Sequence, residues 1–196
     1  MEILKNRVIT GIFSLMLLFS TSTLLAQDDD DMQNDDEQEV EIDDKQELEN
    51  DVKKAKAAFL ANSPEMKDLF NNTEGYVIFP NVGKGAWILG GAAGNGILYE
   101  NGKLQGYAEM RQIDIGFQFG GQAYREVIFF RTKEALNKFK QGRFGFEGTA
   151  SAVIIEEGKA KSVKFEDGVG VAVMPKAGAM IGISVGGQEF DYRDAQ

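Results

Sequence analysis

The sequence contains no cysteine and no histidine among its 196 residues. Without cysteine there is no disulfide framework, so the hydrophobic core must stabilise the fold by itself. The missing thiol and imidazole groups exclude Cys-His and Ser-His-Asp catalysis within the chain, together with metal sites built from sulfur or imidazole ligands. Only carboxylate-type metal sites remain open, and we expect neither a metal nor a cofactor.

The part of the chain expected to fold also lacks a surplus of positive charge. The net charge of −10 arises in residues 27–50, which hold 13 acidic residues and one lysine. Residues 51–196 are nearly balanced, with 18 basic and 17 acidic residues. Because a nucleic-acid-binding domain carries a basic surplus on its folded surface, we expect no nucleic-acid partner.

The acidic segment 27–44 is poor in apolar residues and low in complexity. Such a composition predicts a disordered linker, because like charges repel and little can be buried. A solubilising spacer is the favoured interpretation. A calcium-binding loop is disfavoured, since the run Asp28 to Asp31 lacks the alternating spacing and the glycine of such a loop.

Residues 1–26 have the layout of a secretory signal peptide. Lys5 and Arg7 precede an apolar run over residues 8–19, and small residues end the segment before Gln27. An uncleaved anchor is the alternative, but polar residues interrupt the apolar run before it reaches the about 20 residues of a membrane span. We expect export to the periplasm or the extracellular space. A lipoprotein anchor is excluded because no cysteine stands at the cleavage point.

Residues 45–72 are predicted to form two helices. Leu48, Val52, Ala55 and Phe59 recur at helical spacing and make one apolar stripe. Ser63 and Pro64 are expected to end the first helix and start the second, with Ser63 as N-cap. The favoured interpretation is that both helices pack on the domain. The alternative is that the first lies on a lipid surface, with its apolar side down and its lysines at the headgroups.

From residue 75 to residue 192 the sequence alternates as strands do. Asn101-Gly102, Glu157-Gly158 and Asp167-Gly168 have the composition of hairpin turns. One helix is predicted at 132–141, with Thr132 as N-cap. We therefore expect one α+β domain over residues 45–196. Its N-terminal helices should pack on a strongly curved, glycine-rich antiparallel sheet or partly closed barrel, with the one further helix inserted.

The glycine-rich stretch GKGAWILGGAAGNGILY, residues 83–99, is not a nucleotide-binding loop. It lacks the third glycine of the dinucleotide fingerprint, and a strand rather than a helix follows it. Similar strand-plus-glycine units recur at 116–124 and near the C-terminus, where glycine in a strand marks a bulge, a bend or a close approach. We interpret the glycines as bends in the sheet: Gly85, Gly90, Gly91, Gly94, Gly96, Gly116, Gly120 and Gly121.

The segments GYVIFPNVGKGAWILGGAAGNGILY, GYAEM and GFQFGGQAYREVIFF resemble the SYLF domain family. The resemblance covers residues 51–192, and Ala86 departs from it where the family often has glycine. The family is described as lipid-binding, with phosphoinositide binding in animal members and actin association in fungal ones. For this chain the resemblance implies weak, salt-sensitive association with phospholipid or a membrane surface, with these candidate contacts: Val52, Lys53, Lys54, Lys56, Phe59 and Lys84.

Two other functions remain as alternatives. A structural or protein-interaction scaffold of the cell envelope would use phenylalanines such as Phe117 and Phe129 as a partner surface, although these also fit a plain core. A carboxylate-based hydrolase would need Glu109 and Asp114 as an acid/base pair, but nothing fixes them on one face, and Arg111 can pair with either. We therefore expect a non-enzymatic module without catalytic residues.

Overall fold

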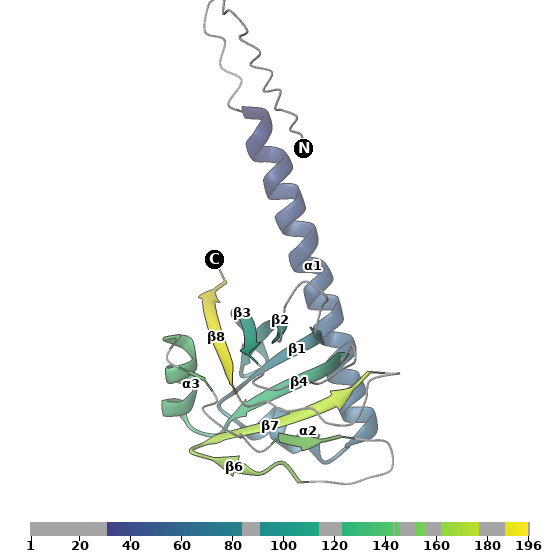
Figure 1. Cartoon of the computed structure of the whole chain (residues 1–196), viewed down its shortest axis with the longest axis vertical. Helices are drawn as coiled ribbons and strands as arrows, with labels where there is room; N and C mark the ends of the chain where they lie inside the picture. The colour runs from purple at the N-terminus through teal and green to yellow at the C-terminus, as the bar shows by residue number, and fades with distance from the viewer. Residues whose placement is uncertain are drawn as a thin grey trace, which may run out of the picture.

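The computed structural model describes residues 31–83, 91–113, 123–142, 144–145, 152–155, 162–176 and 187–195. Two N-terminal helices pack on one eight-stranded, mostly antiparallel sheet, and one further helix follows the fourth strand (Figure 1). The α+β class and its helices are thereby confirmed. The helices are α1 (Asp31–Asn62), α2 (Met66–Asn72) and α3 (Lys133–Lys140). The strands are β1 (Gly75–Gly83), β2 (Gly91–Glu100), β3 (Lys103–Ile113), β4 (Ala123–Phe130), β5 (Ala152–Ile154), β6 (Phe165–Glu166), β7 (Val169–Pro175) and β8 (Gln188–Asp194).

The sheet has the strand order β5-β7-β4-β1-β2-β3-β8, with β6 paired to β7. All described pairs are antiparallel except β5 with β7, which is parallel. The sheet is open and not strongly curled, because its outer strands β5 and β8 do not pair with each other among the described residues. The prediction of a strongly curved sheet or partly closed barrel is therefore wrong.

The glycines of β2 explain part of the difference between the curved sheet that was predicted and the open sheet that is observed. A Cβ atom added to Gly96 would lie 2.6 Å from the Phe79 ring and 2.7 Å from the Ile78 carbonyl oxygen, and one on Gly94 would lie 2.8 Å from the Asn81 carbonyl oxygen. At these two positions, glycine therefore permits close approach of β1. Gly91 also lies in β2. The other glycines interpreted as bends lie outside the described residues: Gly85, Gly90, Gly116, Gly120 and Gly121.

Replacing Gly96 by alanine is expected to lower the free energy of unfolding by about 1–3 kcal/mol, because the new methyl group overpacks against a ring and a backbone carbonyl. Urea denaturation measures the change. Gly83→Ala is the matched control, since a Cβ there meets no atom within 4 Å. Equal effects of the two substitutions would contradict the close-approach account.

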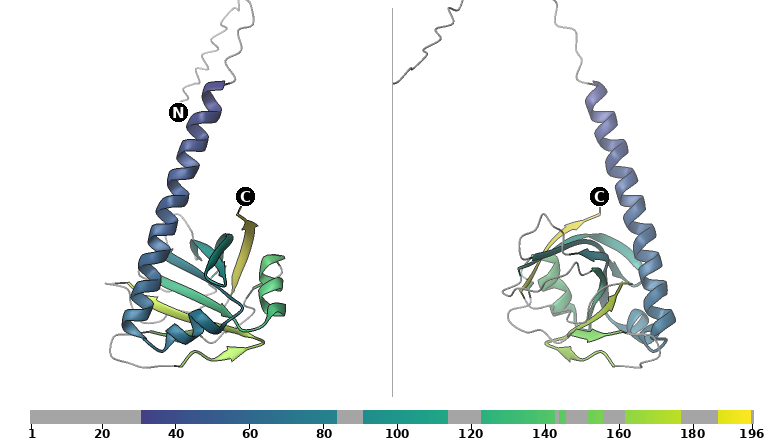
Figure 2. Two further views of the ribbon diagram at one scale, coloured as in Figure 1. Left: turned by 180° about the vertical axis from the view of Figure 1, so that it is seen from behind. Right: turned by 45° about the vertical axis from the view of Figure 1, so that its right-hand side comes forward.

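Each face of the sheet carries its own hydrophobic core. On one face, Val52 and Phe59 of α1 and Phe70 of α2 pack with the sheet residues Ile78 and Phe129. The other face contains Phe79, Ile128 and Phe190, and the apolar side of α3 packs there. Figure 2 shows α1 running across the first face and α3 lying away from it. The N-terminal part of α1 continues beyond the sheet (Figure 1).

Two predicted hairpin turns are present. Asn101 and Gly102 have φ of 51° and 74°, and Asp167 and Gly168 have φ of 49° and 82°. Positive φ at both central residues is the requirement of the hairpin turn that Asn-Gly and Asp-Gly favour. Glu157-Gly158 lies outside the described residues.

The N-terminal end of α3 agrees with the prediction from the sequence, whereas the N-terminal ends of α1 and α2 differ from it. Thr132 caps α3, its side chain accepting a hydrogen bond from the backbone of Ala135, as predicted. The N-cap of α2 is Glu65 rather than Ser63, because a turn closed by the Met66 amide on the Ser63 carbonyl precedes the helix. α1 begins at Asp31, inside the segment 27–44 whose composition predicts a disordered linker.

Candidate functional site

The apolar candidates of α1 lie in the core. Val52 is 2 % exposed and Phe59 is 0 % exposed, and both pack between α1 and the sheet. This arrangement follows from the spacing of the apolar stripe, which presents one side of the helix to a partner surface. Contact of Val52 or Phe59 with lipid would require α1 to leave the sheet, so their lipid-binding role stays a prediction.

Lys56 is held by the aromatic residues beneath α1. Its Nζ atom donates a hydrogen bond of 2.7 Å to the Tyr76 hydroxyl and lies 4.7 Å from the ring centres of Phe70 and Tyr76. Ammonium groups over aromatic faces are attracted by the ring quadrupole, more strongly when partly desolvated. Lys56 therefore helps to fix α1 and α2 on the sheet. The sequence analysis placed Lys56 among the headgroup contacts. Its pairing with Tyr76 could not be predicted, because the two residues are far apart in the sequence.

The side chains of Lys53 and Lys54 lie on the surface of α1. Their side chains are 68 % and 77 % exposed. Lys53 lies 3.8 Å from Glu49, and Lys54 lies 3.1 Å from Asp51. Such exposed pairs hold side chains weakly and are screened by salt. Both ammonium groups are therefore available to an outside partner. Lys84 lies outside the described residues.

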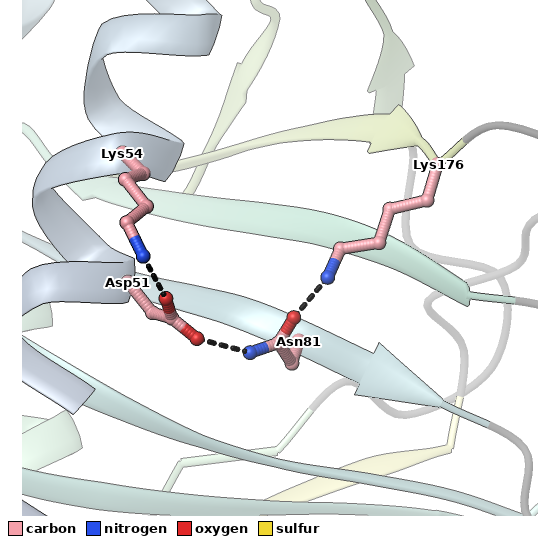
Figure 3. Close-up of polar contacts among 4 residues, drawn as sticks. All are labelled: Asp51, Lys54, Asn81 and Lys176. Atoms are coloured by element: carbon pink, nitrogen blue, oxygen red, sulfur yellow. Dashed lines mark hydrogen bonds and ion pairs between the residues drawn. The ribbon is translucent and has the colours of Figure 1, made fainter. Parts of the chain in front are cut away.

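A series of polar contacts joins α1 to β1 and to the residue that follows β7 (Figure 3). The Asn81 side-chain amide of β1 donates a hydrogen bond of 2.9 Å to Asp51, and Lys176 after β7 donates to the Asn81 oxygen. The hydrogen bond from Lys54, and next that from Asn81, hold the pKa of the Asp51 carboxyl below its usual value. Sequence reasoning missed Asn81 and Lys176, because no periodicity links residues so far apart along the chain.

A groove lies between α1 and the sheet surface formed by β2, β3 and β8. It consists of two cavities of about 800 Å³ and about 530 Å³ that share Asp44, Leu48 and Asn95. Tyr107, Ala108, Glu109, Arg193 and Asp194 complete the larger cavity, with Lys45 of α1. The groove is thus lined by a few apolar side chains, such as Leu48 and Tyr107, among charges of both signs, which suits a ligand or peptide with both apolar and ionic groups.

Two charged side chains of the groove, Glu109 and Arg193, are paired with each other. Glu109 lies between Arg111, at 3.2 Å, and Arg193. Lys45 lies 5.5 Å from the centre of the Tyr107 ring. Of the two carboxylates considered for acid/base catalysis, Glu109 is therefore engaged by two arginines, and Asp114 lies outside the described residues. Within the described ranges, no three acidic side chains gather as a metal site would require.

A second polar site is enclosed in the α3-side core. Glu126 of β4 is 0 % exposed, and its Oε2 atom accepts a hydrogen bond of 2.9 Å from Gln188 of β8. Tyr124 donates to the Gln112 side-chain oxygen at 3.1 Å beside them. We call Gln112, Tyr124, Glu126 and Gln188 the buried polar cluster. Burial raises the pKa of Glu126 to about 7, although the Gln188 hydrogen bond opposes that shift. Sequence reasoning missed Glu126, whose position in an otherwise apolar strand is the signal that could have found it.

A family model matches the C-terminal part of the chain. Residues 111–196, which include β4, α3, β7 and β8, match the family model Ysc84, described as "Las17-binding protein actin regulator". The match covers less than half of the chain and confirms the sequence resemblance to the SYLF domain family over those residues. No curated protein matches the chain. None of the helices in the described ranges is both long and apolar enough to cross a bilayer.

Proposed function

We propose that this protein is an exported, non-enzymatic module that associates with phospholipid surfaces through the outer side of α1. The exposure of Lys53 and Lys54 carries the proposal, because these two side chains are largely open to solvent while the apolar side of the helix is buried. The SYLF resemblance supports lipid as the partner, and the signal-peptide layout of residues 1–26 supports export to the periplasm or beyond. Association is therefore electrostatic, weak and sensitive to salt.

Replacing both Lys53 and Lys54 by glutamine is expected to weaken binding to anionic vesicles roughly 30-fold at low salt. The reason is that each lysine near an anionic surface contributes about 1 kcal/mol. Co-sedimentation with vesicles of phosphatidylglycerol measures the change. The matched control replaces Lys133 and Lys138 of α3, which removes the same charge from the exposed side of another helix. If the control loses as much affinity, or if wild-type binding ignores lipid charge, the proposal fails.

Deleting residues 27–44 is expected to strengthen binding to the same vesicles. The deleted segment carries most of the acidic surplus, and its repulsion from an anionic surface opposes the lysines. The gain should shrink as salt is raised, because ions screen the repulsion beyond about 8 Å at physiological strength. Flotation of the two proteins at low and high salt is the measurement. Unchanged affinity after the deletion would show that the acidic segment does not oppose vesicle binding.

The groove favours a second candidate, a scaffold that binds a protein segment. The description of the family model names binding of a protein, Las17, which is consistent with such a role. Because the chain has no cysteine, Asn95→Cys places one thiol in the groove and Ala57→Cys places one on the exposed side of α1. With a fluorophore on each thiol, vesicles should change the Ala57 signal and leave the Asn95 signal unchanged. A change confined to Asn95 would favour the groove as the binding site.

A further inference from the structure

We propose that the contact between Glu126 and Gln188 is a pH-sensitive device that holds the first residues of β8 on the sheet when Glu126 is protonated and releases them when it ionises. The proposal concerns a conformational property of the fold and is independent of lipid binding. It rests on the enclosure of Glu126, its hydrogen bonds and the position of β8 in the sheet.

The carboxyl group of Glu126 is enclosed with too few partners for an ion. One of its oxygen atoms accepts from Gln188, and the other, Oε1, has no hydrogen-bond partner among the described residues. The Oε1 atom of Gln188 is also buried and unpartnered within the same part of the chain. An ionised carboxylate without compensating partners is costly in such surroundings, whereas a protonated one has a donor to offer.

The groups that face Glu126 carry no compensating positive charge in the described part of the chain. The buried polar cluster supplies Tyr124 of β4, Gln112 of β3 and Gln188 of β8, of which only Tyr124 is titratable. The residues beside Glu126 in the neighbouring strands are Phe79 of β1 and Val173 of β7, both apolar. Desolvation therefore dominates, which is why the pKa of Glu126 rises to about 7.

Ionisation of Glu126 can be relieved only by admitting water, and β8 is the strand that can yield. β4 is paired on both sides, continuously with β7 and, apart from one register shift between Phe79 and Val82, with β1. β8 pairs along its length with β3 alone in the described residues, with one isolated bridge from Glu189 to Gly145 on its other side. Phe190 is anchored among Phe79 and Phe139, with ring centres 5.7 Å and 5.6 Å away. Release is therefore confined to the residues before Phe190.

The direction of the pH effect follows from linkage. In the closed state the first residues of β8 are held on the sheet, and in the open state they are released and water reaches Glu126. Glu126 binds its proton more tightly in the closed state than in the open state, where its pKa has the ordinary value near 4.5. The closed state is therefore fully favoured below about pH 4.5, and the open fraction rises until about pH 7, above which it levels off. Between pH 5 and pH 7 the opening equilibrium should rise on the order of 30-fold.

Hydrogen exchange followed by mass spectrometry tests the proposal on the full chain at pH 5, 6, 7 and 8. After correction for intrinsic exchange, residues 187–189 should lose protection on the order of 30-fold between pH 5 and pH 7. Glu126→Gln should abolish this dependence. Glu189→Gln, which removes an exposed carboxylate from the same strand, should leave it unchanged.

Two outcomes would overturn the proposal. One is protection of residues 187–189 that does not change with pH in the wild-type chain, or a pH dependence that persists in Glu126→Gln. The second outcome is measured on the wild-type chain alone, so this test remains decisive even if the Glu126→Gln variant does not fold. If β4 loses protection as much as β8 does, the pH effect is global unfolding and not release of the edge strand.

Discussion

Replacing Phe59 by alanine is expected to lower the free energy of unfolding by about 3–5 kcal/mol. Phe59 is 0 % exposed and lies in the core between α1 and the sheet, where a truncated side chain leaves a cavity that the surrounding residues cannot fill. Loss of this contact also removes the main apolar anchor of α1. Urea denaturation, followed by circular dichroism, measures the change.

Ala57→Ser is the matched control for Phe59→Ala, because Ala57 lies on the exposed side of the same helix. It should change the free energy of unfolding by less than about 0.5 kcal/mol. A loss below about 1 kcal/mol for Phe59→Ala would mean that α1 is not docked on the sheet in solution. In that case the apolar stripe would be free to meet lipid, as the alternative interpretation of the sequence holds.

Replacing Glu126 by glutamine is expected to raise the free energy of unfolding by about 3 kcal/mol at pH 8. The native fold binds the Glu126 proton with a pKa of about 7, against 4.5 for the unperturbed group. Stability that depends on the protonated carboxyl is therefore complete below about pH 4.5 and is lost as the pH rises to about 7. Glutamine has the same shape, stays neutral and keeps an acceptor for Gln188.

The stabilisation by Glu126→Gln should disappear toward pH 4, where the wild-type carboxyl is itself neutral. Denaturation curves for the two proteins at pH 4, 6 and 8 make the comparison. Glu166→Gln, an exposed carboxylate of β6, serves as the control and should show no pH-dependent gain. A variant that is less stable than the wild type at pH 8 would show that the ionised carboxylate has partners that stabilise it.

Patterns with a local cause predicted the corresponding parts of the fold. The spacing of Val52 and Phe59 indicated one buried side of a helix, and that side packs on the sheet. Thr132 and the pairs Asn101-Gly102 and Asp167-Gly168 predicted a helix cap and two turns, because cap and turn geometry depends on neighbouring residues only.

Features that depend on distant neighbours could not be predicted in this way. Glycine in a strand permits either a bend or a close approach, and only the facing Phe79 ring shows which one Gly96 serves. Lys56 reads as a surface lysine until Tyr76 is placed beneath it. Likewise Gln188 meets Glu126 only because β4 and β8 present side chains to the same face of the sheet.

The groove could not be predicted from the sequence, because it too depends on residues that are far apart along the chain. Asn95 and Arg193 come from strands that are neither adjacent in the sequence nor marked by a motif, and α1 brings Asp44 and Leu48 over them. Only the order β2-β3-β8 and the path of α1 assemble these residues. The exposure of Lys53 and Lys54 could be predicted because their position off the apolar stripe is a property of the helix alone.

The central claim is that α1 stays on the sheet while its outer lysines meet the lipid surface. The most direct test joins α1 to β1 by a short thiol-reactive cross-linker between Asp51→Cys and Asn81→Cys, whose native side chains lie within hydrogen-bond distance. Because the chain has no other thiol, the same protein without the linker is the control. The account predicts equal affinity of the linked and unlinked proteins for anionic vesicles. Loss of vesicle binding on linking would contradict it, since lipid contact would then require the helix to leave the sheet.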